Sequence, residues 1–269
     1  NAVGVTGCRI ISSPRERLIA ILTNNFVPCN GRFPTLMAMI LIFFIPAASP
    51  VRTLAAGAVL TGFILLGIIV TLLMSKLLSS TILKGIPSSF ILELPPYRVP
   101  KAGSVIIRSI RDRTVFVLGR AIAVAAPFGI VIWILANIKI GSVSILDHCT
   151  DFLDPFGRLI GVDGVIVMAF ILGFPANEIV IPVMLMSYMS SGVLTDYSSL
   201  SQLQDILAGC GWTFRTALCV AILCLFHFPC GTTCLTVKKE TGSLKWTACA
   251  FLLPTLTGIM LCMVINMLF

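Results

Sequence analysis

Long apolar segments restrict the fold of this chain more than any other feature of its sequence. Leu54–Leu78, Val115–Ile138 and Trp246–Phe269 each exceed the roughly 20 residues that a helix needs to cross a bilayer. Hydrophobic residues make up 57% of the sequence and charged residues only 11%, against about 25% charged residues in soluble domains. Because so few polar side chains are available to cover a water-exposed surface, the chain is predicted to be an all-α, polytopic transmembrane domain.

Charged residues are concentrated between the apolar segments and predict how the chain is oriented. Residues 76–120 and 238–245 are rich in Lys and Arg, whereas 139–163 carries four aspartates. Basic loops stay on the cytoplasmic side of membrane proteins, so the first two regions are expected inside and the third outside. The net charge of +8 is therefore attributed to membrane orientation and not to nucleic-acid binding.

The segment Gly164–Ser190 is expected to be broken or re-entrant. An outside 139–163 and an inside 238–245 require an odd number of crossings, yet this segment and Ala217–Val237 both lie between them. Its central Gly-Phe-Pro-Ala-Asn-Glu sequence, residues 173–178, leaves pieces too short to span the membrane. Non-helical backbone at membrane depth must line a cavity or be buried in protein, and transporters place binding sites at such breaks.

Glu178 lies beside this break in an otherwise apolar stretch. A carboxylate at the centre of a membrane helix costs about 2.5–3.5 kcal/mol on insertion scales, which favours a functional reason for keeping it. A cation ligand or a proton acceptor is the preferred interpretation. A partner for an internal arginine, or a carboxylate that reaches the membrane interface, remains open.

Two further breaks resemble each other. Phe26–Gly31 and Phe228–Thr232 each place a thiol, Cys29 or Cys230, directly after a proline in an apolar segment. Proline removes a backbone donor and frees a carbonyl one turn earlier, so each break offers a thiol and loose carbonyl oxygens together. Matching breaks of a repeat-built transporter meet at one central site. The alternative is a chance match in a chain with many Cys, Pro and Gly residues.

The other polar residues near the breaks allow less specific predictions. Cys8 also lies beside a glycine, and a mixture of thiols with a carboxylate suits Fe(II) or a neighbouring transition metal. His227 is expected to be a neutral, hydrogen-bonded membrane histidine. The charged residues that flank the breaks are expected to be helix-end charges at the cytoplasmic interface: Arg15, Glu16, Arg17, Arg32, Lys238, Lys239 and Glu240.

At these motifs the sequence resembles the FeoB family of ferrous iron transporters. The Glu-Leu-Pro-Pro-Tyr-Arg and Lys-Lys-Glu-Thr-Gly-Ser elements are the most specific parts of the resemblance, which extends over nearly the whole chain in the order of the family. The matching stretches are Gly7-Cys8, Arg15–Arg17, Phe26–Arg32, Glu93–Pro100, Gly173–Glu178, Phe228–Cys230 and Lys238–Ser243. The chain departs from the family pattern at Asn177, where a cation is usual.

The resemblance implies a multi-pass protein of the bacterial inner membrane that moves Fe(II) into the cell, with metal-linked Cys8, Cys29, Cys230 and Glu178. It implies a first gate-like repeat, a transmembrane hairpin and a cytoplasmic Leu-Pro-Pro-Tyr loop in 1–114. A second gate-like repeat and C-terminal transmembrane helices are expected in 115–269. It also implies an N-terminal GTP-binding domain, whose G-x-x-x-x-G-K-[ST] motif is not in this sequence, so the chain is expected to be part of a longer protein. A small cytoplasmic FeoA-like partner and a homo-oligomer stay open.

The sequence is also compatible with functions other than ferrous iron transport. Transport of a different divalent transition metal is the nearest alternative. A gate-type carrier for a nucleoside or another small polar solute would use Glu178 and Asn177 to bind its substrate. An intramembrane enzyme would use a cysteine nucleophile with His227, although no orienting partner is evident. A non-transporting assembly subunit is the last alternative. The chain is expected to be a transporter domain and not an enzyme.

Overall fold

A computed structural model describes residues 1–46, 50–85, 102–108, 110 and 115–269. Its described residues are helical except for connecting segments and one antiparallel strand pair, β1 (Lys139–Ile140) with β2 (Val143–Ser144). The predicted all-α class is therefore confirmed. The predicted Leu-Pro-Pro-Tyr loop at 94–97 lies outside the described residues.

Four helical segments of the described chain are long and apolar enough to cross a membrane, or five if one bent pair counts as a span. Two of them are continuous helices, α4 (Arg52–Ser80) and α13 (Leu244–Leu268), as the sequence predicts. The other two, Pro14–Phe44 and Phe214–Thr241, are interrupted near their middle. The predicted segment Val115–Ile138 forms α6 (Phe116–Asn137). Within α6, Ala121–Asn137 is a shorter apolar helix and is not among the four long segments.

The first interrupted segment begins at α2 (Pro14–Thr23). Ser13 starts this helix by accepting a hydrogen bond from the backbone of Glu16, and Pro14 occupies the first turn, where no donor is needed. Two 3-10 turns, η2 (Asn24–Phe26) and η3 (Asn30–Arg32), follow at the predicted break. The chain then continues as α3 (Phe33–Met39) and a π-helical turn, η4 (Ile40–Phe44). Ahead of this segment lie α1 (Ala2–Gly7) and the turn η1 (Cys8–Ile10).

The other two predicted breaks are also present. Residues 164–190 form two nine-residue helices, α8 (Gly164–Leu172) and α9 (Val180–Tyr188), separated by a turn η6 (Asn177–Ile179). The prediction that this segment is broken is therefore confirmed. The last break, after His227, separates α11 (Phe214–Phe226) from α12 (Gly231–Thr241).

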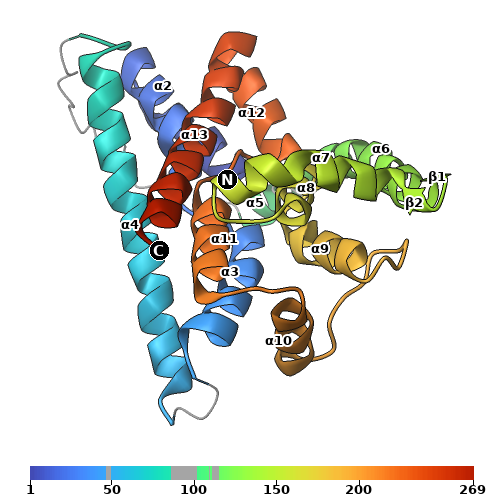
Figure 1. Ribbon diagram of the computed structural model, residues 1–269. Helices are drawn as coiled ribbons and strands as arrows, with labels where there is room; N and C mark the ends of the chain where they lie inside the picture. The colour runs from blue at the N-terminus through green and yellow to red at the C-terminus, as the bar shows by residue number, and fades with distance from the viewer. Residues whose placement is uncertain (47–49, 86–101, 109, 111–114) are drawn as a thin grey trace.

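The two interrupted segments lie side by side and run in opposite directions (Figure 1). α11 packs against α3, while α12 packs against α1 and α13, and α2 packs against α13 and α4. A small apolar cluster joins the end of α4 to the α12–α13 connection through Leu78, Leu83, Val237 and Trp246. Of the described basic residues, Lys76 and Lys84 beside this cluster therefore lie at the same end of the molecule as Lys238, Lys239 and Lys245.

Residues 139–163 differ from the predicted connecting loop. After the strand pair they form α7 (Ile145–Leu159), which meets α8 at an angle of 108°. A reciprocal pair of hydrogen bonds between Ser144 and Asp147 starts this helix, an arrangement that satisfies two backbone donors at once. A search for long apolar runs overlooks α7 because its apolar residues occupy only one face. Two further short helices are α5 (Ala102–Arg108) and α10 (Leu200–Gly209).

Candidate functional site

The three breaks in the helices meet at one place in the fold. The turns η3 and η6 pack against each other. The backbone N–H of Gly231, just after the α11–α12 break, donates a 2.8 Å hydrogen bond to the carbonyl oxygen of Phe174 at the α8–α9 break. Segments distant in the sequence are thus joined through the backbone groups that their broken helices leave without intrahelical partners.

Arg32 lies at the centre of this junction with no exposed surface. Its guanidinium donates to the carbonyl oxygens of Leu225 (2.8 Å), His227 (2.9 Å) and Phe228 (3.2 Å), where α11 ends. It also donates to the carbonyl oxygen of Asn25 at 3.1 Å, at the other break. The expectation of a helix-end charge at the cytoplasmic interface is therefore wrong for Arg32.

The end of α11 explains why a charged side chain is stable there. The last carbonyls of a helix lack intrahelical donors and carry a partial negative charge, so a guanidinium supplies both hydrogen bonds and the opposite charge. Asn25 adds a second link, because its amide donates to the carbonyl oxygen of His227 at 2.9 Å. The sequence contains a signal for Arg32, since an arginine inside an interrupted apolar segment calls for the same explanation as Glu178. For Asn25 only its position in the break hints at a role.

A chain of polar contacts runs from His227 to Cys29. The Nε2 atom of His227 lies 3.1 Å from the side-chain oxygen of Asn177, whose amide nitrogen is 3.5 Å from the Cys29 sulfur. The Nδ1 atom of His227 faces the carbonyl oxygens of Leu223 and Cys224 at 3.0 and 3.1 Å. The prediction that His227 is hydrogen-bonded is confirmed; its side chain is also buried, and both ring nitrogens are engaged by groups other than a cysteine thiol.

Glu178 lies against the first break. A Cβ atom added to Gly31 would overlap the Glu178 carboxylate, whose carbon would be only 2.8 Å away. The carboxylate therefore lies beside Gly31 in η3, and Gly31 is two residues after Cys29. Its residue is exposed in this single chain, while Asn177, the preceding residue, is buried.

Cys230 lies at the third break, directly before α12. Its sulfur is 3.3 Å from the hydroxyl oxygen of Thr233, and the residue is half-buried. Cys29 directly precedes η3, which contains Arg32, and Cys230 follows the end of α11 whose carbonyl oxygens Arg32 binds. The structure thus gathers Cys29, Cys230 and Glu178 around one junction, although no direct contact joins all three.

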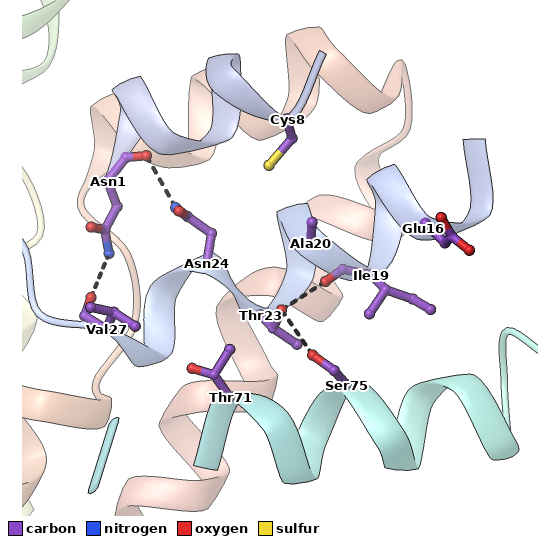
Figure 2. Close-up of a pocket in the computed structure, with 10 residues that line it drawn as sticks. All are labelled: Asn1, Cys8, Glu16, Ile19, Ala20, Thr23, Asn24, Val27, Thr71 and Ser75. Carbon is purple, nitrogen blue, oxygen red and sulfur yellow. Dashed lines mark hydrogen bonds between the residues drawn. The ribbon is translucent and has the colours of Figure 1, made fainter. Parts of the chain in front are cut away.

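Cys8 occupies a different position, beside a pocket between α1, α2 and α4 (Figure 2). Its sulfur donates to the carbonyl oxygen of Gly4 at 3.3 Å. The pocket reaches the first break at Asn24 and Val27. Within the part of the chain that the structure describes, no three or more His, Cys, Asp or Glu side chains lie close enough together to hold a metal ion.

Cys8 is expected to be a weak metal ligand at neutral pH. Partial burial, and to a smaller extent the charge of Glu240, raise the pKa of its thiol, and a thiol must lose its proton to bind a metal. Alkylation also requires the thiolate, so the rate of Cys8 alkylation in the folded protein should rise at higher pH than in the unfolded chain. Peptide mass spectrometry after timed iodoacetamide treatment across a pH series measures both midpoints, and equal midpoints would contradict the expectation.

Two family models match the chain in succession. Residues 60–111 match the model described as the C terminus of ferrous iron transport protein B, and residues 118–244 match the Gate model, described as nucleoside recognition. No solved structure matches the chain.

Curated relatives match almost the entire chain. An Fe(2+) transporter FeoB of Staphylococcus aureus (strain MSSA476) is 30% identical over 97% of this chain and 38% of its own length. An Fe(2+) transporter FeoB of Leptospira interrogans is 26% identical over 94% of this chain and 39% of its own length. A fusion of Fe(2+) transport protein A with FeoB in Porphyromonas gingivalis is 24% identical over 91% of this chain and 34% of its own length.

The chain therefore spans well under half the length of these relatives. The chain has several helices apolar enough to cross a membrane. It also matches the two family models in succession and the curated FeoB relatives over almost its whole length. The chain belongs to the FeoB family.

Proposed function

We propose that this chain is the membrane-embedded part of a transporter that carries ferrous iron across a bacterial inner membrane into the cell. The observation that carries the proposal is the meeting of three interrupted helices around a buried arginine, with two thiols and a carboxylate at the junction. The names of the relatives support Fe(II) as the cargo. In this proposal Cys29, Glu178 and Cys230 contact the ion at the junction, and Cys8 lies further along its path.

The chemistry of these residues suits an ion that must be released again. Thiolates favour borderline and soft metals, whereas carboxylates and carbonyls favour harder ions. Cys29 and Glu178 offer one donor of each kind across the packed turns η3 and η6. A closed set of four protein ligands would hold a metal as a structural site does, while a partial set leaves positions for water and permits exchange.

Partners of the whole transporter belong to the same proposal. We expect a GTP-binding domain in the longer protein and a small FeoA-like protein on the cytoplasmic side. The relative in which transport protein A is fused to FeoB supports the second expectation. Binding of this chain to a purified FeoA-like protein tests it directly.

Serine substitution at the junction thiols tests the proposed function. We expect Cys29→Ser and Cys230→Ser to lower the initial rate of Fe(II) uptake by about 10-fold or more, because a hydroxyl is a much poorer ligand than a thiolate for such a metal. Uptake is measured anaerobically in vesicles that contain the full-length protein, with an iron-quenched dye inside. Cys149→Ser, on α7 outside the junction, is the matched control and should transport normally.

Uptake at the wild-type rate in both junction variants would contradict a role of the thiols. Because the Gate model is described as nucleoside recognition, the same vesicles are also tested with a radiolabelled nucleoside. Saturable nucleoside uptake without any Fe(II) uptake would favour a small-solute carrier instead.

A further inference from the structure

The segment formed by α1 and η1 lies between α2 and α12. α2 leads into the first break and α12 leads away from the third, so both helices belong to the parts of the interrupted segments that lie nearer the basic connections. α1 packs against both of them. It therefore separates these two helices on the side of the junction that is predicted to face the cytoplasm.

The beginning of α1 is hydrogen-bonded to the first break. The side-chain amide of Asn1 donates to the side-chain oxygen of Asn25 at 3.0 Å and to the carbonyl oxygen of Val27 at 3.2 Å (Figure 2). Asn24 donates in return to the carbonyl oxygen of Asn1 at 3.1 Å. The same side-chain oxygen of Asn25 also accepts from Arg32 at 3.4 Å, so one shared acceptor joins α1 to the buried guanidinium.

The turn η1 is fixed to the other end of α12 by an ion pair. The Nε and Nη2 atoms of Arg9 donate to the two carboxylate oxygens of Glu240 at 2.7 and 2.6 Å. Such two-point pairing of a guanidinium with a carboxylate is stronger and more directional than a single contact. The Glu240 side chain is only 10% exposed, whereas that of Arg9 is 57% exposed, so Arg9 is the partner that can move away into solvent.

Between these two attachments α1 buries little of its own surface. Val5 is its one fully buried residue, in the small apolar cluster that contains Val237, while Val3 is 73% exposed. A Cβ atom added to Gly4 would overlap the side-chain oxygen of Asn24, so α1 lies directly on the first break. Segments with few buried apolar contacts open at a lower free-energy cost than the core of a protein. α1 can therefore move away without unfolding the helices around it.

We propose that α1 and η1 form a lid over the cytoplasmic side of the junction, which the ion pair between Arg9 and Glu240 holds closed. The inference rests on the proposed function, because it names the step that controls how an ion leaves the junction. Release of Arg9 from Glu240 lets α1 move away from α12 and from the first break, which opens a route between α2 and α12. Cys8 lies in η1 directly before Arg9, so its thiol moves with the lid.

Amide hydrogen exchange tests the lid without requiring transport. The full-length protein in lipid nanodiscs carries Arg9→Glu, Glu240→Arg or both substitutions, and mass spectrometry follows the peptides that cover residues 2–10. Each single substitution places like charges opposite each other, so we expect these peptides to exchange at least about fivefold faster than in the wild type. The double substitution restores an ion pair of reversed polarity and should recover most of the protection.

Fe(II) uptake into vesicles is measured with the same variants. Both single variants should raise the initial rate about threefold or more, because the lid is then open for more of the time. The double variant should return to the wild-type rate. Arg158→Gln is the matched control, since it breaks a comparable 2.6 Å ion pair with Asp154 on α7, and it should alter neither the exchange of residues 2–10 nor the uptake rate.

Unchanged exchange in both single variants, or lost protection that the double variant does not recover, would show that the ion pair does not hold α1 in place. Faster exchange with an unchanged or lower uptake rate would overturn the role of α1 as a lid. Absence of Fe(II) uptake in every variant, the wild type included, would overturn the proposed function, whereas the exchange pattern tests the ion pair in either case.

Discussion

Arg32→Ala is expected to destabilise the protein more than any other single substitution at the junction. The guanidinium satisfies carbonyl oxygens from two separate breaks, and each buried carbonyl left without a donor costs about 1–3 kcal/mol. A loss of at least about 3 kcal/mol should follow, which is a large share of the stability of an ordinary domain. The loss of stability is measured as a fall in the thermal unfolding midpoint of the detergent-solubilised protein. The monodisperse peak of the protein in gel filtration should be lost as well.

Two matched variants make this result specific. Arg32→Lys retains the charge but offers one compact ammonium group instead of a planar fork of donors, so its stability should lie between those of Arg32→Ala and the wild type. Lys239→Ala removes an exposed cation from α12 and should leave the unfolding midpoint unchanged. If Arg32→Ala unfolds at the wild-type temperature, the guanidinium does not hold the two breaks together.

Much of this architecture is encoded in short-range patterns. The apolar segments predict α4 and α13, and the prolines at 28, 175 and 229 mark the three breaks, because a proline interrupts the hydrogen bonding of a helix wherever it falls. The side-chain oxygen of Ser13 and the proline after it likewise account for the start of α2. Local chemistry determines these features, and each is visible in one stretch of sequence.

The contacts between the breaks are not visible in the same way. Three of the carbonyl oxygens that Arg32 binds lie 193 to 196 residues away in sequence, and a carbonyl leaves no mark on residue identity. The contact of Asn177 with Cys29 also depends on how two turns pack. The sequence therefore predicts Cys29, Glu178 and Cys230 as candidates, while the separate location of Cys8 follows from the packing of α1 on α12.

Gly31→Ala is expected to reduce Fe(II) uptake strongly while leaving the fold intact. The new methyl group would overlap the Glu178 carboxylate, which is the end of a flexible side chain and can rotate away at little cost. In the proposed function this displacement removes the oxygen donor opposite Cys29, so uptake should fall about 10–100-fold, the range found when the support of a metal ligand is disturbed.

A matched pair of variants decides whether Gly31→Ala acts through Glu178. Gly62→Ala adds the same methyl group to α4, where no atom lies within 4 Å, and it should transport normally. Glu178→Asp shortens the side chain by one methylene, which makes room for the new methyl group. The double variant Gly31→Ala with Glu178→Asp should therefore recover part of the uptake that Gly31→Ala loses. If the double variant loses uptake as the sum of the two single variants, Gly31 and Glu178 act independently, and their close approach has no role in moving the ion.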